Sequence, residues 1–169
     1  MTKKINIIFI SFLLLCLFLS RLIPHPPNFT LFISASFYFS LILGFNYIFL
    51  ILLTFILSDI FLGFHDISFV IWSLIIFNGY VSRFFKRKFL TRIFGVLNCS
   101  LIFFLVTNLS FWLFSGLYTM NFSGLIECYY FAIPFFKNQI ISTLILSLFI
   151  ELLINYKFKK KLKTPTFNF

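Results

Sequence analysis

Acidic residues, and charged residues in general, are scarce in this chain. Four of the 169 residues are Asp or Glu, charged residues make up 11% of the sequence, and hydrophobic residues make up 61%. The mean hydropathy is +1.06. No polar stretch is long enough to bury a core of its own, which excludes a separate water-soluble domain. We therefore predict a single all-α domain over residues 1–169 that is integral to a membrane.

Cysteine pairs and catalytic motifs are also missing. The three cysteines are far apart and form no C-x-x-C pair: they are Cys16, Cys99 and Cys128. This spacing indicates neither a disulfide framework nor a zinc site. No G-x-S-x-G, H-E-x-x-H or Walker motif is present, so we predict a protein that is not an enzyme and holds no metal or cofactor. One catalytic alternative stays open, in which His25 or His65 acts as a base beside Asp59 or Asp66.

Basic residues are in excess, and their placement indicates a membrane topology. The formal net charge is +10, yet the 14 Lys and Arg interrupt hydrophobic runs and form no single water-facing surface, which argues against nucleic acid binding. Lys3, Lys4, five basic residues in 83–92 and five in 157–163 account for 12 of the 14. Loops rich in positive charge stay on the cytoplasmic side of a membrane. Six transmembrane helices with both ends inside, and a basic cytoplasmic tail over 157–169, satisfy this distribution.

Six apolar runs predict the transmembrane helices. They cover approximately 5–23, 31–43, 46–62, 67–81, 93–117 and 139–156. Between the last two, Ser123 is expected to cap a short amphipathic helix that lies across the outer mouth and that Pro134 ends. We expect this multi-pass chain in the lipid bilayer of the bacterial inner membrane.

The stretch 21–30, R-L-I-P-H-P-P-N-F-T, is the first polar segment after an apolar helix. Three prolines within four positions restrict φ and remove backbone donors, so a helix cannot continue and a rigid extended turn is expected. Arg21, His25, Asn28 and Thr30 would then present a guanidinium, an imidazole, an amide and a hydroxyl to one side of a ligand pocket.

Asp59 lies near the end of an apolar run, in S-D-I-F-L-G-F-H-D. An unpaired carboxylate at such a depth costs about 2.5 to 3.5 kcal/mol on insertion scales. Arg21 ends the first apolar run on the same side of the membrane. We therefore predict that Arg21 and Asp59 form an ion pair.

Small residues recur every four positions on the second predicted helix, at Ser36, Ser40 and Gly44. Small residues at this spacing form a stripe along which another helix can approach closely. The stripe is interpreted either as packing within this chain or as docking to a separate membrane subunit.

Further polar side chains are predicted to face the same pocket. Asn108 and Trp112 are four positions apart and share a helix face, where they can present an amide and an indole donor. An interhelical hydrogen bond and an interfacial Trp are the alternative. The predicted substrate-binding set is Arg21, His25, Asn28, Thr30, Asp59, His65, Asn108, Trp112, Tyr118, Glu127 and Asn138. The 30 Phe residues fall on every predicted helix and in every phase, so we assign them no role as a class.

Four motifs in a fixed order carry a resemblance to a known group of proteins. They are P-H-P-P-N-F-T (24–30), S-D-x-x-L-G-F-H (58–65), V-T-N-x-x-x-W (106–112) and Y-x5-G-L-x-E-C-Y-x-x-A-I-P-F-F-x-N (118–138). With these motifs the chain resembles an uncharacterised bacterial family of small membrane proteins labelled as transport proteins. That family is in turn remotely similar to the S components of energy-coupling factor (ECF) vitamin transporters.

The resemblance implies a function as well as a fold. It implies six helices, a pocket capped by outer loops and surrounded by the four motifs, and uptake of a vitamin or cofactor precursor. It also implies a transmembrane coupling protein with ATPase subunits as a partner. The alternative function is a membrane scaffold or assembly subunit whose polar outer face binds another protein.

Overall fold

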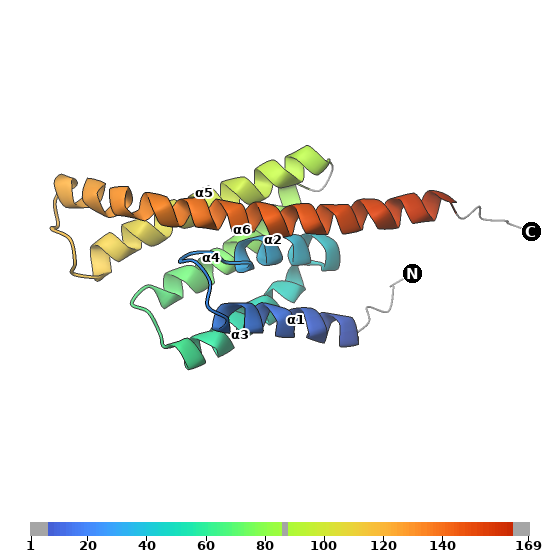
Figure 1. The fold of residues 1–169 in the computed structure, drawn as a ribbon, viewed down its shortest axis with the longest axis horizontal. Coiled ribbons are helices and arrows are strands. Elements are labelled where there is room, and N and C mark those ends of the chain that lie inside the picture. The colour runs from blue at the N-terminus through green and yellow to red at the C-terminus, as the bar shows by residue number, and fades with distance from the viewer. Residues whose placement is uncertain (1–6, 86–87, 164–169) are drawn as a thin grey trace, which may run out of the picture.

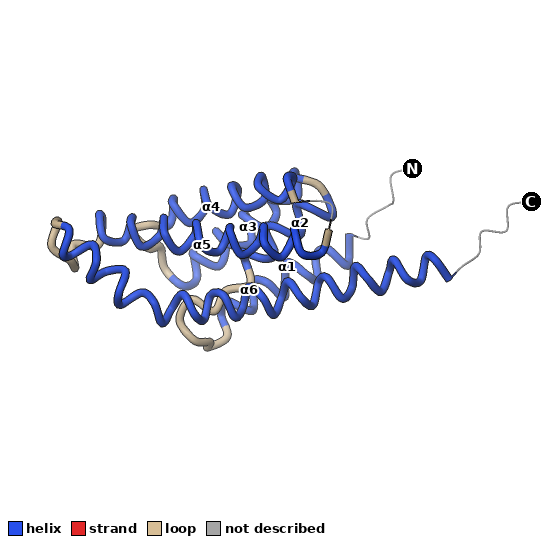
Figure 2. The backbone as a smooth tube through the Cα atoms, turned by 90° about the horizontal axis from the view of Figure 1, so that it is seen from above, coloured by secondary structure: helices blue, strands red, loops and turns tan. Residues whose placement is uncertain are grey.

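The computed structural model of this chain describes residues 7–85 and 88–163, and every regular element in that part is helical (Figure 2). The elements are α1 (Ile7–Leu22), α2 (Phe32–Leu43), η1 (Phe45–Tyr47), α3 (Ile48–Leu62), α4 (Ser68–Val81), η2 (Ser82–Phe84), α5 (Phe89–Phe114) and α6 (Phe122–Lys163). The predicted all-α fold class is confirmed for the described residues. The expected helix start at Ile5 and the basic residues Lys3, Lys4, Lys86 and Arg87 lie outside them, as does the tail segment 164–169.

The second helix, α2, lies at the centre of the bundle and packs against α3, α4, α5 and α6 (Figure 1). Residues 32–38 are all buried, and so is Ser40. A Cβ added to Gly79 of α4 would lie 2.6 Å from the Ser40 Oγ atom, so the two helices meet closely at this point. Ser36 and Ser40 of the small-residue stripe therefore lie inside the chain, whereas Gly44 is exposed just beyond the end of α2.

Within the described residues, three helical segments are long and apolar enough to cross a membrane: Phe45–Leu62, Phe89–Phe114 and Phe122–Tyr156. The other apolar helices are shorter than the about 20 residues that a hydrocarbon core requires. They are Ile7–Leu22, Phe32–Leu43 and Ser68–Phe84. Large apolar side chains such as Phe61 and Phe69 are exposed along the bundle, as expected for a surface that meets lipid. These features indicate a membrane protein.

The last helix, α6, corrects the prediction for the end of the chain. A short helix ended by Pro134 and a separate helix over 139–156 were expected, but one continuous helix of 42 residues contains Pro134. At 1.5 Å per residue this helix is about 63 Å long.

Packing against α5 explains why Pro134 does not end the helix. Proline removes one helical hydrogen bond, and membrane helices tolerate this loss where neighbouring helices support them. Before Pro134, the Tyr129 hydroxyl donates to the Leu105 carbonyl oxygen at 2.6 Å. After it, Gln139 Nε2 donates to the Ser100 carbonyl oxygen at 2.7 Å. Both flanks of the proline are thus held on the same neighbour.

Asn121, and not Ser123, caps α6. The Asn121 Oδ1 atom accepts a hydrogen bond from the Gly124 backbone N–H at 2.8 Å, and the helix already begins at Phe122. Gly124 itself has no room for a side chain, because an added Cβ would lie 2.1 Å from the Thr119 carbonyl oxygen. The predicted cap was therefore two residues too late.

The two ends of the bundle differ in their chemistry. At one end α5 and α6 project beyond the other four helices (Figure 1). This end, with the loops 23–31, 63–67 and 115–121, is termed the cavity end. The opposite end is termed the basic end. It holds the start of α1, the end of α6 and the basic residues Arg83, Lys88 and Arg92.

Candidate functional site

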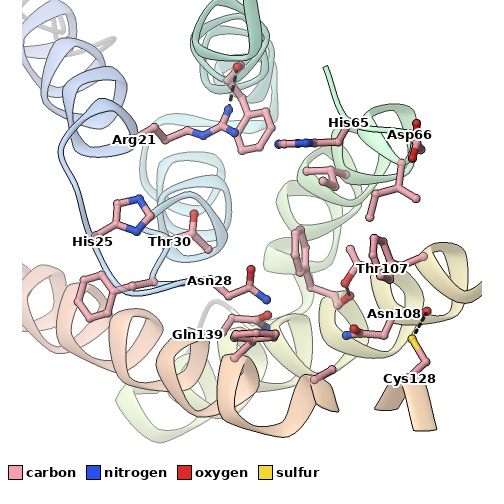
Figure 3. A pocket seen from close by; sticks show the side chains of 18 of the residues that line it. Arg21, His25, Asn28, Thr30, His65, Asp66, Thr107, Asn108, Cys128 and Gln139 are labelled. Atoms are coloured by element: carbon pink, nitrogen blue, oxygen red, sulfur yellow. Dashed lines mark hydrogen bonds between the residues drawn. The ribbon is translucent and has the colours of Figure 1, made fainter. Parts of the chain in front are cut away.

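A cavity of about 620 Å³ opens at the cavity end. Its walls come from the α1–α2 loop, the α3–α4 loop, the second half of α5 and the first half of α6 (Figure 3). The volume falls within the range of about 300–1,000 Å³ that small-molecule sites occupy. Segments more than 100 residues apart in the chain therefore meet around one space.

The cavity brings together a part of the predicted substrate-binding set. The residues of that set that line it are Arg21, His25, Asn28, Thr30, His65, Asn108 and Tyr118. Those that do not line it are Asp59, Trp112, Glu127 and Asn138. In Figure 3 the side chains of Arg21 and His65 point toward one another, and Asn108 and Gln139 lie on the opposite side of the cavity.

Arg21 and Asp59 form the predicted ion pair. The Arg21 NH1 atom lies 2.6 Å from Asp59 Oδ1, which confirms that prediction. The same nitrogen donates to the Ser58 hydroxyl at 2.6 Å and to the Phe55 carbonyl oxygen at 3.2 Å. The guanidinium carbon also lies 3.8 Å from the centroid of the Phe55 ring. One guanidinium nitrogen is thus committed to α3, and one face of the group is covered.

Asp59 is buried outside the cavity wall, where it contacts residues of the bundle. Its side chain is 1% exposed, and its second oxygen accepts a hydrogen bond from Trp72 Nε1 at 2.8 Å. Both carboxylate oxygens are therefore occupied by protein donors. Asp59 holds Arg21 in place and, unlike Arg21, does not line the cavity.

The loop 23–31, which contains the three prolines, is hydrogen-bonded to α6. A turn closes where the Phe29 N–H donates to the Pro26 carbonyl oxygen at 3.0 Å, with Asn28 in the left-handed region at φ 59°. Asparagine tolerates this region better than most residues. Asn138 Nδ2 then donates to the Pro27 carbonyl oxygen at 3.1 Å, and the Ser142 hydroxyl donates to the Thr30 carbonyl oxygen at 3.0 Å. Asn138 is thus an anchor for the loop and not part of the cavity wall.

Asn108 and Trp112 do not share one pocket. Asn108 lines the cavity, and its Nδ2 atom donates to the Phe104 carbonyl oxygen at 2.7 Å. Trp112 Nε1 instead donates to the Thr119 carbonyl oxygen at 3.0 Å, which holds the turn between α5 and α6. The shared helix face was correctly expected, but the turn takes the indole donor away from the cavity.

Tyr118 enters the cavity from the turn between α5 and α6. Partial burial raises the pKa of its phenol, and the neighbouring Cys128 and Glu127 raise it further. The hydroxyl therefore stays protonated at neutral pH and is able to donate a hydrogen bond. Glu127 itself is exposed and lies outside the cavity wall.

Several residues of the wall were not predicted. Gln139 and Thr107 are buried polar residues in apolar helices, a signal that could have found both. Asp66 also lines the cavity, as do the aromatic side chains of Phe29, Phe55, Phe64, Phe103, Phe111, Phe131 and Phe135. Phenylalanine therefore does contribute a surface here. Because the sequence has Phe on every helix, no pattern could have marked these seven.

A second buried ion pair lies toward the basic end and was also missed. Glu151 of α6 is 1% exposed and accepts two hydrogen bonds from Arg92 of α5, Nε to Oε1 at 2.6 Å and NH2 to Oε2 at 2.6 Å. The Tyr38 hydroxyl of α2 donates to the same Oε1 atom at 2.9 Å. The network joins three helices. A carboxylate inside an apolar helix calls for a partner, and this signal could have found the pair.

Within residues 7–85 and 88–163, no group of three or more His, Cys, Asp and Glu is arranged to hold a metal ion.

Comparison with known proteins places the chain in one family. No curated protein and no solved structure gives a significant match. The model of DUF6580, a family of unknown function, matches residues 1–163, and the chain therefore belongs to the DUF6580 family.

Proposed function

We propose that this chain is a multi-pass protein of a bacterial inner membrane that binds a small organic solute and takes part in its uptake. In this proposal it acts like the S component of an ECF transporter, and the solute is a vitamin or a cofactor precursor. One observation carries the proposal: polar side chains from four separate segments converge on one cavity at one end of the helical bundle. Such cavities are the usual sites of small-molecule binding.

The proposed topology has six transmembrane helices with both chain ends in the cytoplasm. Positive charge favours the cytoplasmic side, so the basic end faces inward and the cavity end faces outward. The three shorter helices would cross where the bilayer is locally thin or where loops extend them. The projecting α5–α6 pair would then carry one cavity wall beyond the hydrocarbon core.

Uptake requires energy that this chain does not supply by itself. The sequence has no Walker motif for ATP binding. A transmembrane coupling protein with ATPase subunits is the proposed partner, and an ion gradient is the other source of energy. Within this chain, Asn28, Thr30, Asn108 and Tyr118 would give directional hydrogen bonds, and the Phe-rich wall would exclude water.

The first test is native mass spectrometry of the detergent-purified chain, followed by denaturation and identification of any released small molecule. Asn108→Ala is the test variant and Asn98→Ala is its matched control. Both asparagines lie on α5 and donate to a carbonyl of their own helix, Asn98 to Phe94 at 2.8 Å, but only Asn108 lines the cavity. The two variants should therefore lose similar helix contacts.

A vitamin-sized compound that co-purifies with the natural chain and with Asn98→Ala, but not with Asn108→Ala, supports the proposal. Loss of the compound from both variants would point to helix stability and not to the cavity. An empty chain that instead brings down another membrane protein would contradict solute binding and favour a scaffold.

A further inference from the structure

The positive charge of Arg21 is already compensated inside the cavity wall. Arg21 is the one Lys or Arg that lines the cavity within the described residues. Its NH1 atom is 2.6 Å from Asp59 Oδ1, and its guanidinium lies over the Phe55 ring. A ligand anion would have to share a guanidinium whose charge is paired. Arg21 therefore gives little reason for an anionic ligand.

The wall formed by α5 and α6 presents hydrogen-bond acceptors. Asn108 Nδ2 donates to a backbone carbonyl at 2.7 Å, and Gln139 Nε2 donates to the carbonyl and hydroxyl oxygens of Ser100 at 2.7 and 2.8 Å. A backbone carbonyl only accepts, so these contacts determine which way each amide is turned. The Thr107 hydroxyl likewise donates to the Phe103 carbonyl oxygen at 2.8 Å. The two amide oxygens, the Thr107 hydroxyl lone pair and the second Nδ2 hydrogen of Asn108 remain for a ligand, so acceptors outnumber donors on this wall.

One further group at the cavity favours positive charge. Asp66 is the one acidic residue that lines the cavity within the described part of the chain, and it is exposed. The His25 ring is turned away from this role, because its Nδ1 atom lies 3.0 Å from the Pro26 carbonyl oxygen within the loop.

The aromatic side chains of the cavity wall also favour a positively charged ligand. Seven Phe side chains line the cavity. The faces of aromatic rings attract cations, and such rings are the usual surface for binding ammonium groups. A neutral ligand would use these rings only for apolar contact.

We infer that the cavity takes an organic cation, an amine or a positively charged nitrogen heterocycle whose N–H donors face Thr107, Asn108 and Gln139. This inference rests on the proposed function, because it names the class of solute that the cavity binds. It assigns to Asp66 the role of the counter-charge at the mouth.

Two probes with the same ring and opposite charge test the inference: tryptamine, a cation, and indole-3-propionate, an anion. Each is added to the purified full-length chain in detergent, and binding is followed by the shift in melting temperature and by titration calorimetry. Asp66→Asn removes the acid at the cavity, and Glu127→Gln makes the same change on the neighbouring surface outside it. Both residues are exposed, so neither change should impair folding.

Tryptamine is expected to raise the melting temperature by a few degrees at millimolar concentration, and indole-3-propionate is not. Asp66→Asn should weaken tryptamine binding roughly three- to tenfold, the effect of losing one partly screened charge. Glu127→Gln should leave it unchanged.

Other results separate the inference from the proposed function. Preferential binding of indole-3-propionate, lost in Arg21→Gln, would overturn the cation inference and leave solute binding intact. Equal weakening of tryptamine binding in Asp66→Asn and Glu127→Gln would also overturn it, because a general surface charge would then be responsible. No shift with either probe, together with no co-purified compound, would contradict both the inference and the proposed function.

Discussion

Two arginine–carboxylate pairs, one at each end of the bundle, use the same chemistry in different surroundings. In both pairs the carboxylate is 1% exposed and the closest nitrogen lies 2.6 Å from it. Glu151 receives two nitrogens of Arg92 and the hydroxyl of Tyr38. Asp59 receives one nitrogen of Arg21 and the indole of Trp72. The Arg92–Glu151 pair thus has two nitrogen–oxygen contacts and involves three helices. The Arg21–Asp59 pair has one such contact, and its arginine lines the cavity.

This difference indicates two roles. The Arg92–Glu151 pair joins three helices and is termed the clamp, whereas the Arg21–Asp59 pair holds a residue of the cavity wall and is termed the support. A two-point contact between a guanidinium and a carboxylate is strong and directional, which suits the joining of α5, α6 and α2. A one-point contact leaves the other guanidinium nitrogens of Arg21 outside the ion pair, and Arg21 lines the cavity. We therefore expect the Arg92–Glu151 pair to determine stability and the Arg21–Asp59 pair to determine binding as well.

The largest effect is expected from Glu151→Gln. The change leaves the Arg92 charge buried without its carboxylate, a loss that typically costs about 3–5 kcal/mol in the free energy of unfolding. Chemical unfolding of the purified chain in detergent measures this free energy.

A double variant, Arg92→Met with Glu151→Met, is the control for that loss. Replacing both members of a buried ion pair by apolar residues is often close to neutral, so most of the stability should return. If the double variant is as unstable as Glu151→Gln, the contacts of Arg92 outside the pair are responsible and the clamp interpretation is wrong.

A smaller loss of stability is expected from Asp59→Asn, the same chemical change at the cavity end. We expect about 1–3 kcal/mol, because the asparagine still accepts from Trp72 and water in the cavity can reach the Arg21 guanidinium. Retention of a co-purified solute should fall as well, since Arg21 loses its orientation. Equal destabilisation by Asp59→Asn and Glu151→Gln would remove the distinction between clamp and support.

The third member of each network allows a finer comparison. Tyr38→Phe removes the hydroxyl that donates to Glu151, and Trp72→Phe removes the indole N–H that donates to Asp59. Hydrogen bonds to charged groups contribute about 1.5–3 kcal/mol. Tyr38 is fully buried whereas Trp72 is partly exposed, so unfolding measurements should show the larger loss for Tyr38→Phe. The reverse order would mean that the cavity end is the drier of the two.

The smallest effect concerns the pH dependence at Tyr118. Its pKa is raised above the usual value of 10.0, so the folded chain favours the neutral phenol. Its contribution to stability is complete below that usual value and is lost as the pH rises through the raised pKa. The phenolate absorbance of the natural chain minus that of Tyr118→Phe reports this titration. Ionisation at or below the usual value would show that the phenol is fully hydrated.

One of the two ion pairs could be predicted from the sequence, and the reason is the number of available cations. Arg21 ends the first apolar run and Asp59 lies near the end of the third, so alternating helix direction places both on the side that holds few basic residues. Glu151 lies on the side with 12 of the 14 Lys and Arg, so the sequence does not show which of them is its partner. Gln139 and the seven Phe of the cavity wall were missed because their positions depend on how segments far apart in the chain pack together.

Local rules also failed at Pro134 and succeeded at the loop 23–31. Both segments contain proline, yet only the loop breaks a helix. Three prolines in four positions remove too many backbone donors for any packing to replace. The single Pro134 loses one hydrogen bond, and contacts with α5 on both sides of it maintain the helix.

The sequence by itself determined the membrane character, the all-helical fold class and the loop of three prolines, because hydrophobic length and proline content act locally along the chain. Only the tertiary structure decided the continuity of α6, the clamp at Glu151 and the acceptors of the cavity wall. These features arise from contacts between helices far apart in the chain. Side-chain direction at such contacts follows from helix register, which apolar composition alone leaves undetermined.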